Sequence, residues 1–354
     1  MPARLKSVAA VCRSHLRGLL ICLGVLFFGL PRVSTVVVAA DAQPIRFLHE
    51  WGQEGEGPDE FWFPIDIAIN SADELLISDH LNHRIQKFDT SGKRLGALET
   101  LPNPGGIVIG PEGELLLTHF RASGQSDSSE GDFVSVYSAD GRLLRRWGKK
   151  GKAAGEFDCP GGIAVSAEGE VFVADQTNRR VQVFSRTGEF LRAWGEYGDD
   201  PGQFGGKASR LSRVGGPQFV AFDEKGNVWT TEGANCRIQS FTPTGKLLSH
   251  WGSDEDRAGA FGGYFTGFDG KPAKGLKGPV ALCFDRDGHL WVSTVSGRIQ
   301  EFDASGTFLR GFGDKQGTAR GEFFAPHGLA FDSAGHLYVV DSYNQRIQKF
   351  DVGK

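Results

Sequence analysis

Helical periodicity and sulfur are both scarce in this sequence. Its 354 residues include one methionine against 50 glycines, and no window repeats apolar residues at helical spacing. These absences exclude a helical bundle and favour a chain with many turns. In place of helices the chain has short alternating runs, such as EVFVAD at residues 170–175, whose period of two is typical of β-strands. The sequence therefore predicts an all-β protein.

The motifs of common catalytic and metal-binding chemistries are also missing. The sequence contains no GxSxG, HExxH or P-loop pattern. Its five cysteines (Cys12, Cys22, Cys159, Cys236 and Cys283) include no CxxC or CxxCH spacing, which excludes a zinc ribbon, a haem attachment site and a disulfide scaffold. We expect Cys283 to be a small core residue. A disulfide between Cys159 and Cys236 stays open as an alternative to free thiols, because sequence does not fix the separation of their Cα atoms.

The first forty residues differ in composition from the rest. Basic residues precede the apolar run GLLICLGVLFFGL, and small residues follow it, which is typical of a secretory signal peptide. Only fourteen residues separate Arg17 from Arg32, which is short for a membrane-spanning helix. We expect residues 1–40 to be removed and residues 41–354 to be extracytoplasmic, secreted or periplasmic, without a membrane span. An uncleaved anchor is the alternative.

Positive charge is scarce once this segment is gone. Loss of the five basic residues within 1–40 leaves 34 lysines and arginines against 43 acidic residues, a net charge of −9. Nucleic-acid binding needs a basic face, so the composition argues against a nucleic-acid partner.

Two patterns recur along the mature chain at fixed spacing. The phrase R-[IV]-Q starts at Arg84, Arg180, Arg237, Arg298 and Arg346. The pattern P-x-x-[apolar]-x-[apolar] starts at Pro64, Pro104, Pro160, Pro217, Pro279 and Pro326. Nine residues after each of these prolines stands a glycine, or Asp73 in the first copy. Six starts with one spacing indicate six structural repeats.

Each repeat reads as four short strands joined by turns. In the third repeat the strands are GGIAVS, EVFVAD, RVQVFS and FLRAWG. The motif D-x-x-N-x-R, here Asp175, Asn178 and Arg180, stands between the second and third strands, and the second and fifth repeats lack it. Asp and Asn can close a turn, and Arg can bridge to a carboxylate or a carbonyl. We predict a structural role for this motif, because a catalytic group is rarely needed in several copies.

The phrases RIQKF, NRRVQVF and WGKKGKAAGEFDCPGGIAVSAEGEVFVADQTN resemble NHL repeats, and the resemblance covers residues 45–354. It implies a six-bladed β-propeller of four-stranded antiparallel blades. The last repeat stops after the turn glycine Gly353, whereas residues 45–52 (IRFLHEWG) are a fourth strand with nothing before it. We therefore predict that this N-terminal strand completes the last blade and closes the ring, which removes unpaired sheet edges. The Trp or Phe that ends each fourth strand should fill the space between blades.

Repeat-to-repeat differences concentrate in loops that a propeller places on one face. We predict a recognition surface there, formed by residues 122–132, 203–216 and 253–278. The second segment contributes Arg210 and Arg213 to a small basic patch, and the third contributes Tyr264 and Phe265. Exposed aromatic side chains suit contact with a partner. The alternative is that they fold down as an inert lid over the channel mouth.

In each repeat, the residue that follows the proline at the start of the first strand should lie nearest the central channel. These residues include Gln218 and His327, and Asp66 follows one position later. The dipeptide Pro326–His327 resembles positions at which peptidyl-hydroxyglycine amidating lyases hold zinc, which implies a metal-dependent site completed by a residue such as His119. The residues that follow the other five prolines are not of a metal-binding type. We therefore predict no metal and no cofactor, and keep a metal-dependent lyase or hydrolase around His327 and Asp66 as the alternative function.

The sequence as a whole favours an exported binding module that takes a protein or a small-molecule ligand on the loop-elaborated face. The candidate binding residues are His327, Asp66, Gln218, His119, Tyr264, Phe265, Arg210 and Arg213.

Overall fold

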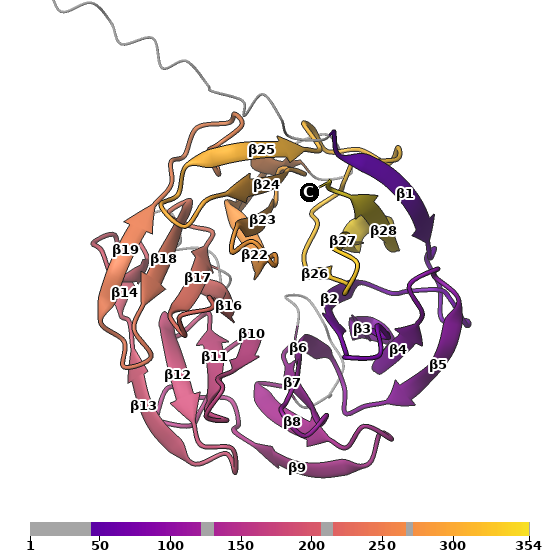
Figure 1. The fold of residues 1–354 in the computed structure, drawn as a ribbon. Coiled ribbons are helices and arrows are strands. Elements are labelled where there is room, and N and C mark those ends of the chain that lie inside the picture. Colours follow the sequence, from indigo (N-terminus) through magenta and orange to yellow (C-terminus); the bar gives the residue numbers. More distant parts are fainter. Residues whose placement is uncertain (1–43, 122–130, 207–214, 267–271, 354) are drawn as a thin grey trace, which may run out of the picture. The chain divides into compact units, whose positions relative to one another are not determined.

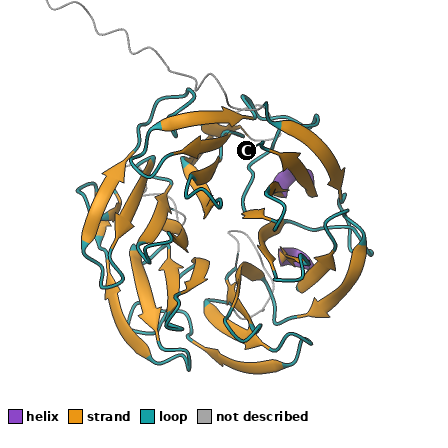
Figure 2. Ribbon diagram, viewed as in Figure 1, coloured by secondary structure: helices purple, strands orange, loops and turns teal. Residues whose placement is uncertain are grey.

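The computed structural model describes residues 44–121, 131–206, 215–266 and 272–353, with the side chains of residues 272–276 excepted. These residues form six four-stranded antiparallel sheets and two small two-stranded sheets. Figure 1 shows the six sheets arranged as blades around a centre, and Figure 2 shows that the regular structure consists of strands apart from two short helices. The predicted fold, an all-β six-bladed propeller, is confirmed.

The strands follow the repeats blade by blade, each blade running from the centre of the ring outward. Blades 1 and 2 comprise β2 (Pro64–Ile69), β3 (Leu75–Asp79), β4 (Arg84–Phe88), β5 (Arg94–Glu99), β6 (Pro104–Ile109), β7 (Leu115–His119), β8 (Phe133–Tyr137) and β9 (Leu143–Trp147). Blades 3 and 4 comprise β10 (Pro160–Val165), β11 (Val171–Asp175), β12 (Arg180–Phe184), β13 (Phe190–Trp194), β16 (Pro217–Phe222), β17 (Val228–Glu232), β18 (Arg237–Phe241) and β19 (Leu247–Trp251). Blades 5 and 6 comprise β22 (Pro279–Phe284), β23 (Leu290–Thr294), β24 (Ile299–Phe302), β25 (Phe308–Phe312), β26 (Leu329–Phe331), β27 (His336–Asp341), β28 (Arg346–Asp351) and β1 (Arg46–Trp51).

Two features interrupt this regular pattern. Small sheets form in the connections before blades 4 and 5: β14 (Tyr197–Gly198) with β15 (Phe204–Gly205), and β20 (Tyr264–Thr266) with β21 (Pro272–Lys277). One-turn 3-10 helices, η1 (His80–Asn82) and η3 (Ser342–Asn344), join the second and third strands of blades 1 and 6. In the described part of the chain, no helix has the length and apolar character needed to cross a membrane.

The last blade is completed by the N-terminal strand. β1 pairs antiparallel with β28, with Arg46 opposite Asp351 and Trp51 opposite Ile347, and the sheet order is β1-β28-β27-β26. β1 lies on the outside of the ring, as do β5, β9, β13, β19 and β25 (Figure 1). This is the closure that the strand count predicts.

Aromatic residues at the ends of the outer strands pack between neighbouring blades. Trp147 of β9 contacts Phe184 of blade 3, with ring centroids 5.8 Å apart, and Trp251 of β19 contacts Phe302 of blade 5 at 4.7 Å. Blade 1 has Leu98 at this position, and it packs against the core cluster formed by blades 1 and 2. The predicted role of these residues in filling the space between blades is confirmed.

A glycine turn covers each of these tryptophans from the next blade. Gly188 has φ +91°, and a Cβ atom on it would lie 2.7 Å from Cδ2 of Trp147. The same relation holds for Gly245 over Trp194 and Gly306 over Trp251. The position therefore requires glycine both for its left-handed backbone and for the close approach of the indole ring.

The D-x-x-N-x-R motif forms a repeated hydrogen-bond network. In blade 3, Oδ2 of the buried Asp175 accepts hydrogen bonds from Nε of Arg180 at 2.8 Å and from Nδ2 of Asn178 at 2.9 Å. Arg180 also donates to the backbone carbonyls of Ala153 and Glu156, each at 2.8 Å. Blade 1 has the same bonds through Asp79 and blade 6 through Asp341. The motif thus ties the strand connection of one blade to the loop that enters it, as its structural interpretation predicts.

Candidate functional site

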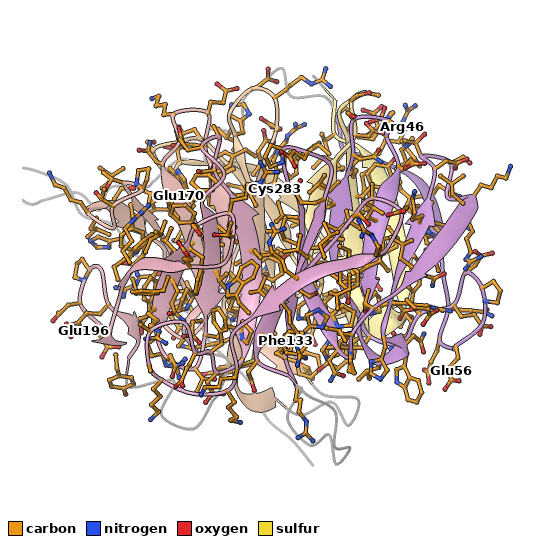
Figure 3. All side chains as sticks on the ribbon, turned by 90° about the horizontal axis from the view of Figure 1, so that it is seen from below. Arg46, Glu56, Phe133, Glu170, Glu196 and Cys283 are labelled. Atoms are coloured by element: carbon orange, nitrogen blue, oxygen red, sulfur yellow. The ribbon has the colours of Figure 1, made fainter. Side chains whose placement is uncertain are left out.

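Two kinds of connection meet on one face of the propeller. The N–H of Trp62, just before β2, donates to Oδ1 of Asp79 at 2.8 Å, and the N–H of Leu81, between β3 and β4, donates to the carbonyl of Trp62 at 3.0 Å. Blades 3 and 6 repeat this contact, so the loops into the first strands lie beside those between the second and third. We call this side the loop face. Figure 3 shows Glu56 and Glu196 of such loops at one edge of the molecule, and Arg46 and Glu170 at the other.

Aromatic rings gather at the centre of the loop face. Phe63 is half-buried and lies 5.1 Å from Tyr343, 5.8 Å from His327 and 6.1 Å from His80, measured between ring centroids. The cluster also includes Phe120, Phe219, Phe265 and Phe324. Aromatic groups that keep part of their surface exposed bind apolar or ring-bearing ligands well. The sequence prediction missed Phe63, Phe120, Phe324 and Tyr343, because all four lie outside the segments that vary most between repeats.

The backbone fixes the position of Phe63 in this cluster. Its φ is +59°, in the left-handed region that bulky residues rarely adopt. Its N–H donates to Oε1 of Gln345 in blade 6, with a nitrogen–oxygen distance of 2.7 Å. Gln345 of blade 6 therefore fixes the backbone that carries the aromatic side chain of Phe63.

His80 and His327 are neutral members of the cluster. Burial lowers the pKa of each imidazole to about 4. Nδ1 of His80 lies 3.0 Å from the carbonyl of Pro104, and Nδ1 of His327 lies 2.9 Å from the carbonyl of Ala325. Nε2 of His80 has no hydrogen-bond partner among the described residues. Both rings therefore present uncharged imidazole near neutral pH.

Asp66 is a buried, hydrogen-bonded side chain, and its role in binding stays a prediction. Its Oδ1 accepts the N–H of Ile67 at 2.9 Å, and its Oδ2 accepts the N–H of Ile107 in blade 2 at 3.0 Å. Burial raises its pKa to about 7. Through these two hydrogen bonds the side chain joins β2 of blade 1 to β6 of blade 2. In the described chain, neither Asp66 nor His327 belongs to a group of three or more metal-binding side chains.

His119 is buried in a structural position, and its role in binding stays a prediction. Its side chain is fully buried at the end of β7, with Nδ1 2.7 Å from the carbonyl of Pro102 and Nε2 2.6 Å from Oγ of Ser135. Its ring stacks on Phe133 with centroids 4.4 Å apart. Burial lowers its pKa to about 3. It pairs with Pro104 in the register in which Asp79 pairs with Pro64, so it occupies the position of the motif aspartate.

The two aromatic residues predicted to contact a partner from the loop before blade 5 differ in burial. Phe265 is buried, with its ring 4.8 Å from that of Tyr343 and 5.2 Å from that of Phe324, as the lid alternative predicts. Tyr264 is 51% exposed on the adjacent position of β20. Because successive side chains of a strand point to opposite faces, β20 buries one ring and presents the other.

A groove with a volume of about 390 Å³ runs beside the exposed tyrosine. It is lined by residues of both charge signs together with polar and aromatic groups, among them Asp256, Tyr264, Thr266, Arg298, Lys315 and Phe324. Arg298 forms an ion pair with Asp256. This groove is the described part of the loop face that best combines a concave shape with exposed aromatic and charged side chains.

The remaining predicted residues add little to this site. Gln218 is half-buried at the start of β16, and a Cβ atom on Gly233 would lie 2.3 Å from its Nε2, so its amide is packed against blade 4. Arg210 and Arg213 lie outside the described residues, as do most of residues 122–132. Cys159 and Cys236 are buried and are not joined by a disulfide, and Cys283 is half-buried.

Comparison with curated proteins finds relatives across most of the chain. The E3 ubiquitin-protein ligase TRIM32 of Homo sapiens is 28% identical over 346 residues, which cover 88% of this chain and 45% of that protein. The protein brain tumor of Drosophila melanogaster is 24% identical over 147 residues, 39% of this chain and 13% of that protein. The chain thus spans less than half the length of the curated relatives it matches.

Solved structures show the same fold at lower identity. A streptogramin B lyase superposes with a TM-score of 0.56 at 16% identity, covering 87% of this chain and 98% of that one. The protein XC5397 of Xanthomonas campestris, described as a gluconolactonase, gives 0.57 at 17% identity, covering 89% and 97%. Both likenesses concern the fold alone. These comparisons do not show the similarity to amidating lyases that the sequence analysis describes.

The family model described as NHL repeat matches residues 61–88, 157–184 and 325–350. These stretches correspond to blades 1, 3 and 6, the blades that carry D-x-x-N-x-R. Three blades of this six-bladed β-propeller therefore match the NHL repeat.

Proposed function

We propose that this protein is an exported interaction module that binds a protein partner through the loop face. An NHL propeller fits such a role, and the observation that carries the proposal is the pairing of Tyr264, 51% exposed, with the adjacent groove. Tyrosine supplies large contact area at low conformational cost and is enriched where partners bind. The charged groups in the groove, Arg298 and Lys315 against Asp256 and Asp314, would give the contact its orientation.

The central aromatic cluster supports the same surface. Phe63, Phe120, Phe324 and Tyr343 each keep part of their side chain exposed around the channel mouth. Trp62, which is 44% exposed, stands next to Phe63 in the connection to β2. Monomeric proteins rarely leave several aromatic groups exposed on one face without a binding role.

A binding measurement tests this proposal. The partner is first isolated from an extracytoplasmic fraction and purified, and its Kd is then measured against the wild type and Tyr264→Ala. We expect at least tenfold weaker binding, about 1.4 kcal/mol, for the variant. The matched control is Leu144→Ala, which removes a similarly exposed side chain (41%) from an outer strand and should leave Kd unchanged. Equal affinity of wild type and Tyr264→Ala would refute the binding surface.

Export is tested separately. The signal-like composition of residues 1–40 supports it, and a mature N-terminus at Asp41 is expected from the small residues before it. The intact mass of protein recovered from the cell exterior or the periplasm measures this directly. Recovery of the protein only inside the cell, with residues 1–40 retained, would contradict export while leaving the binding surface to be judged by its own experiment.

A further inference from the structure

A second site lies on the face opposite the loop face, between blades 5 and 6. There the turn that joins β22 to β23 and the turn that joins β26 to β27 border a groove with a volume of about 680 Å³. The first turn runs from Asp285 to His289 and the second from Asp332 to His336. The groove shares no residue with the surface proposed for the partner.

Three side chains of blade 5 converge at this groove. Nδ1 of His289 lies 2.8 Å from Oε1 of Glu301 and 3.6 Å from Oδ2 of Asp285. All three ligand atoms lie within 4.8 Å of one another, and all three residues line the groove. A tetrahedral zinc ion with bonds of about 2.0–2.2 Å holds its ligands about 3.3–3.6 Å apart, so only small shifts separate this arrangement from a bound ion. Within the described residues it is the one such group of three.

Neighbouring groups orient both carboxylates toward the histidine. Oδ1 of Asp285 accepts the N–H groups of Asp287 at 3.0 Å and His289 at 2.9 Å, and Nε1 of Trp291 donates to Oδ2 at 2.9 Å. Oε2 of Glu301 is paired with Nε of Arg310, which leaves Oε1 facing the imidazole. Carboxylates that bind metal ions are normally fixed by such outer hydrogen bonds.

Blade 6 repeats the aspartate and the histidine of this turn but has Lys349 at the place of Glu301. Asp332 and His336 occupy the positions of Asp285 and His289, with Nδ1 of His336 2.9 Å from Oδ2 of Asp332. Opposite Tyr338, however, stands Lys349, whereas Glu301 stands opposite Trp291 in blade 5. Nζ of Lys349 lies 3.5 Å from Oδ2 of Asp332. An ammonium group therefore occupies the place that a carboxylate ligand takes in blade 5, so blade 6 cannot hold the ion.

We propose that Asp285, His289 and Glu301 bind one divalent transition-metal ion of the zinc class, with its open coordination position facing the groove. One imidazole and two carboxylates suit Zn²⁺ better than Ca²⁺, which prefers oxygen ligands in greater number. Both carboxylates offer an oxygen to the ion, while Arg310 stays paired with Oε2 of Glu301. The ion is bound by Nδ1 of the neutral imidazole of His289, whose single proton is then on Nε2, and a ring that starts as imidazolium releases its Nδ1 proton to solvent.

The experiment uses tag-free full-length protein, stripped with a chelator and titrated with Zn²⁺, Co²⁺ and Ca²⁺ by calorimetry. We expect one Zn²⁺ per chain, with Co²⁺ giving the visible absorption of a low-coordinate site. Glu301→Gln and His289→Ala should lose this binding, at least tenfold in Kd. The matched control is His336→Ala in blade 6, which should bind as the wild type does.

Thermal unfolding and circular dichroism of the stripped variants establish that each remains folded. If a variant fails to fold, His289→Gln, which is close in volume, replaces it in the comparison. The proposal would be overturned if the wild type bound Ca²⁺ but not Zn²⁺ or bound no ion. It would also be overturned if Glu301→Gln bound Zn²⁺ with unchanged affinity, or if His336→Ala lost binding to the same extent.

Discussion

Blades 2 and 3 are neighbours, yet they fill one buried position with different chemistry. In blade 3, Asp175 forms an ion pair with Arg180 at 2.8 Å. In blade 2, His119 occupies the position of the aspartate and stacks on Phe133, which occupies that of the arginine. The ion pair of one blade is thus a pair of stacked rings in the next.

The difference follows from the connection that precedes each blade. The arginine of blade 3 donates to the carbonyls of Ala153 and Glu156, both in the connection between β9 and β10. The connection between β5 and β6, which precedes blade 2, contains only residues 100–103. This short connection has no counterparts of the Ala153 and Glu156 carbonyls. Burying a guanidinium without such acceptors would lower the stability of the fold. The motif therefore depends on the length of the preceding loop as well as on its own residues.

The largest expected effect is the loss of the carboxylate in blade 3. Asp175→Ala leaves Arg180, whose side chain is 16% exposed, without its partner. We expect the free energy of unfolding to fall by about 3–5 kcal/mol. In blade 5 the same position holds Thr294, whose hydroxyl bonds with Ser296 and Arg298. Thr294→Ala should cost only about 1 kcal/mol. Urea unfolding measures both, and equal losses would remove the distinction between the blades.

A graft tests whether the loop, rather than the motif, decides the chemistry. The double variant His119→Asp/Phe133→Arg gives blade 2 the residues of blade 3 at both positions. We expect it to lose about 3 kcal/mol of unfolding free energy, because the new arginine meets no loop carbonyls. Urea unfolding with unchanged slope is the measurement. A double variant as stable as the wild type would show that the motif suffices by itself.

The two buried groups should respond to acid with opposite sign. Burial lowers the pKa of His119 to about 3 and raises the pKa of Asp175 above its ordinary value. A histidine whose pKa is lower folded than unfolded, near 6.5, stabilises the protein above pH 6.5. This stability is lost as the pH falls toward 3, by about 1.4 kcal/mol per unit. The contribution of Asp175 instead grows as the pH falls from its folded pKa toward its unfolded value near 3.9.

Comparison of variants isolates the histidine contribution. Between pH 6.5 and 4.5, His119→Gln should lose about 2–3 kcal/mol less stability than the wild type. Unfolding free energies at four pH values measure the slopes. Parallel slopes for His119→Gln and the wild type would mean that the imidazole is not held neutral.

The smallest expected effect concerns the junction where blades 2 and 3 meet. Gly188 and Gly169 both lie in blade 3 with φ of +91° and +85°. A Cβ on Gly188 would lie 2.7 Å from the Trp147 ring, whereas the nearest atom to one on Gly169 is 3.8 Å away. We expect Gly169→Ala to cost about 1 kcal/mol and Gly188→Ala about 2 kcal/mol. Thermal unfolding measures the stability of both variants. Equal losses would mean that the Trp147 ring moves aside without a cost in stability.

The structural position of His119 could have been recognised from the sequence. Fifteen residues separate the first proline of each repeat from the position of the motif aspartate, and the same count leads from Pro104 to His119. That spacing places His119 in a structural position rather than at the channel mouth. No comparable signal existed for Asp66, because the second of its two N–H donors, Ile107, belongs to another blade.

The strands, the number of blades and the closure by residues 46–51 were predictable from the sequence, because period-two patterning and turn chemistry act over a few residues. Which polar and aromatic groups face solvent was not predictable in this way. Phe265 and Tyr264 are adjacent in sequence, yet one packs on the central cluster and the other lies 51% exposed. Burial depends on what a neighbouring blade brings against a side chain, and that partner is distant in sequence. The convergence of Asp285, His289 and Glu301 has the same origin, since cross-strand pairing brings Glu301 opposite the turn.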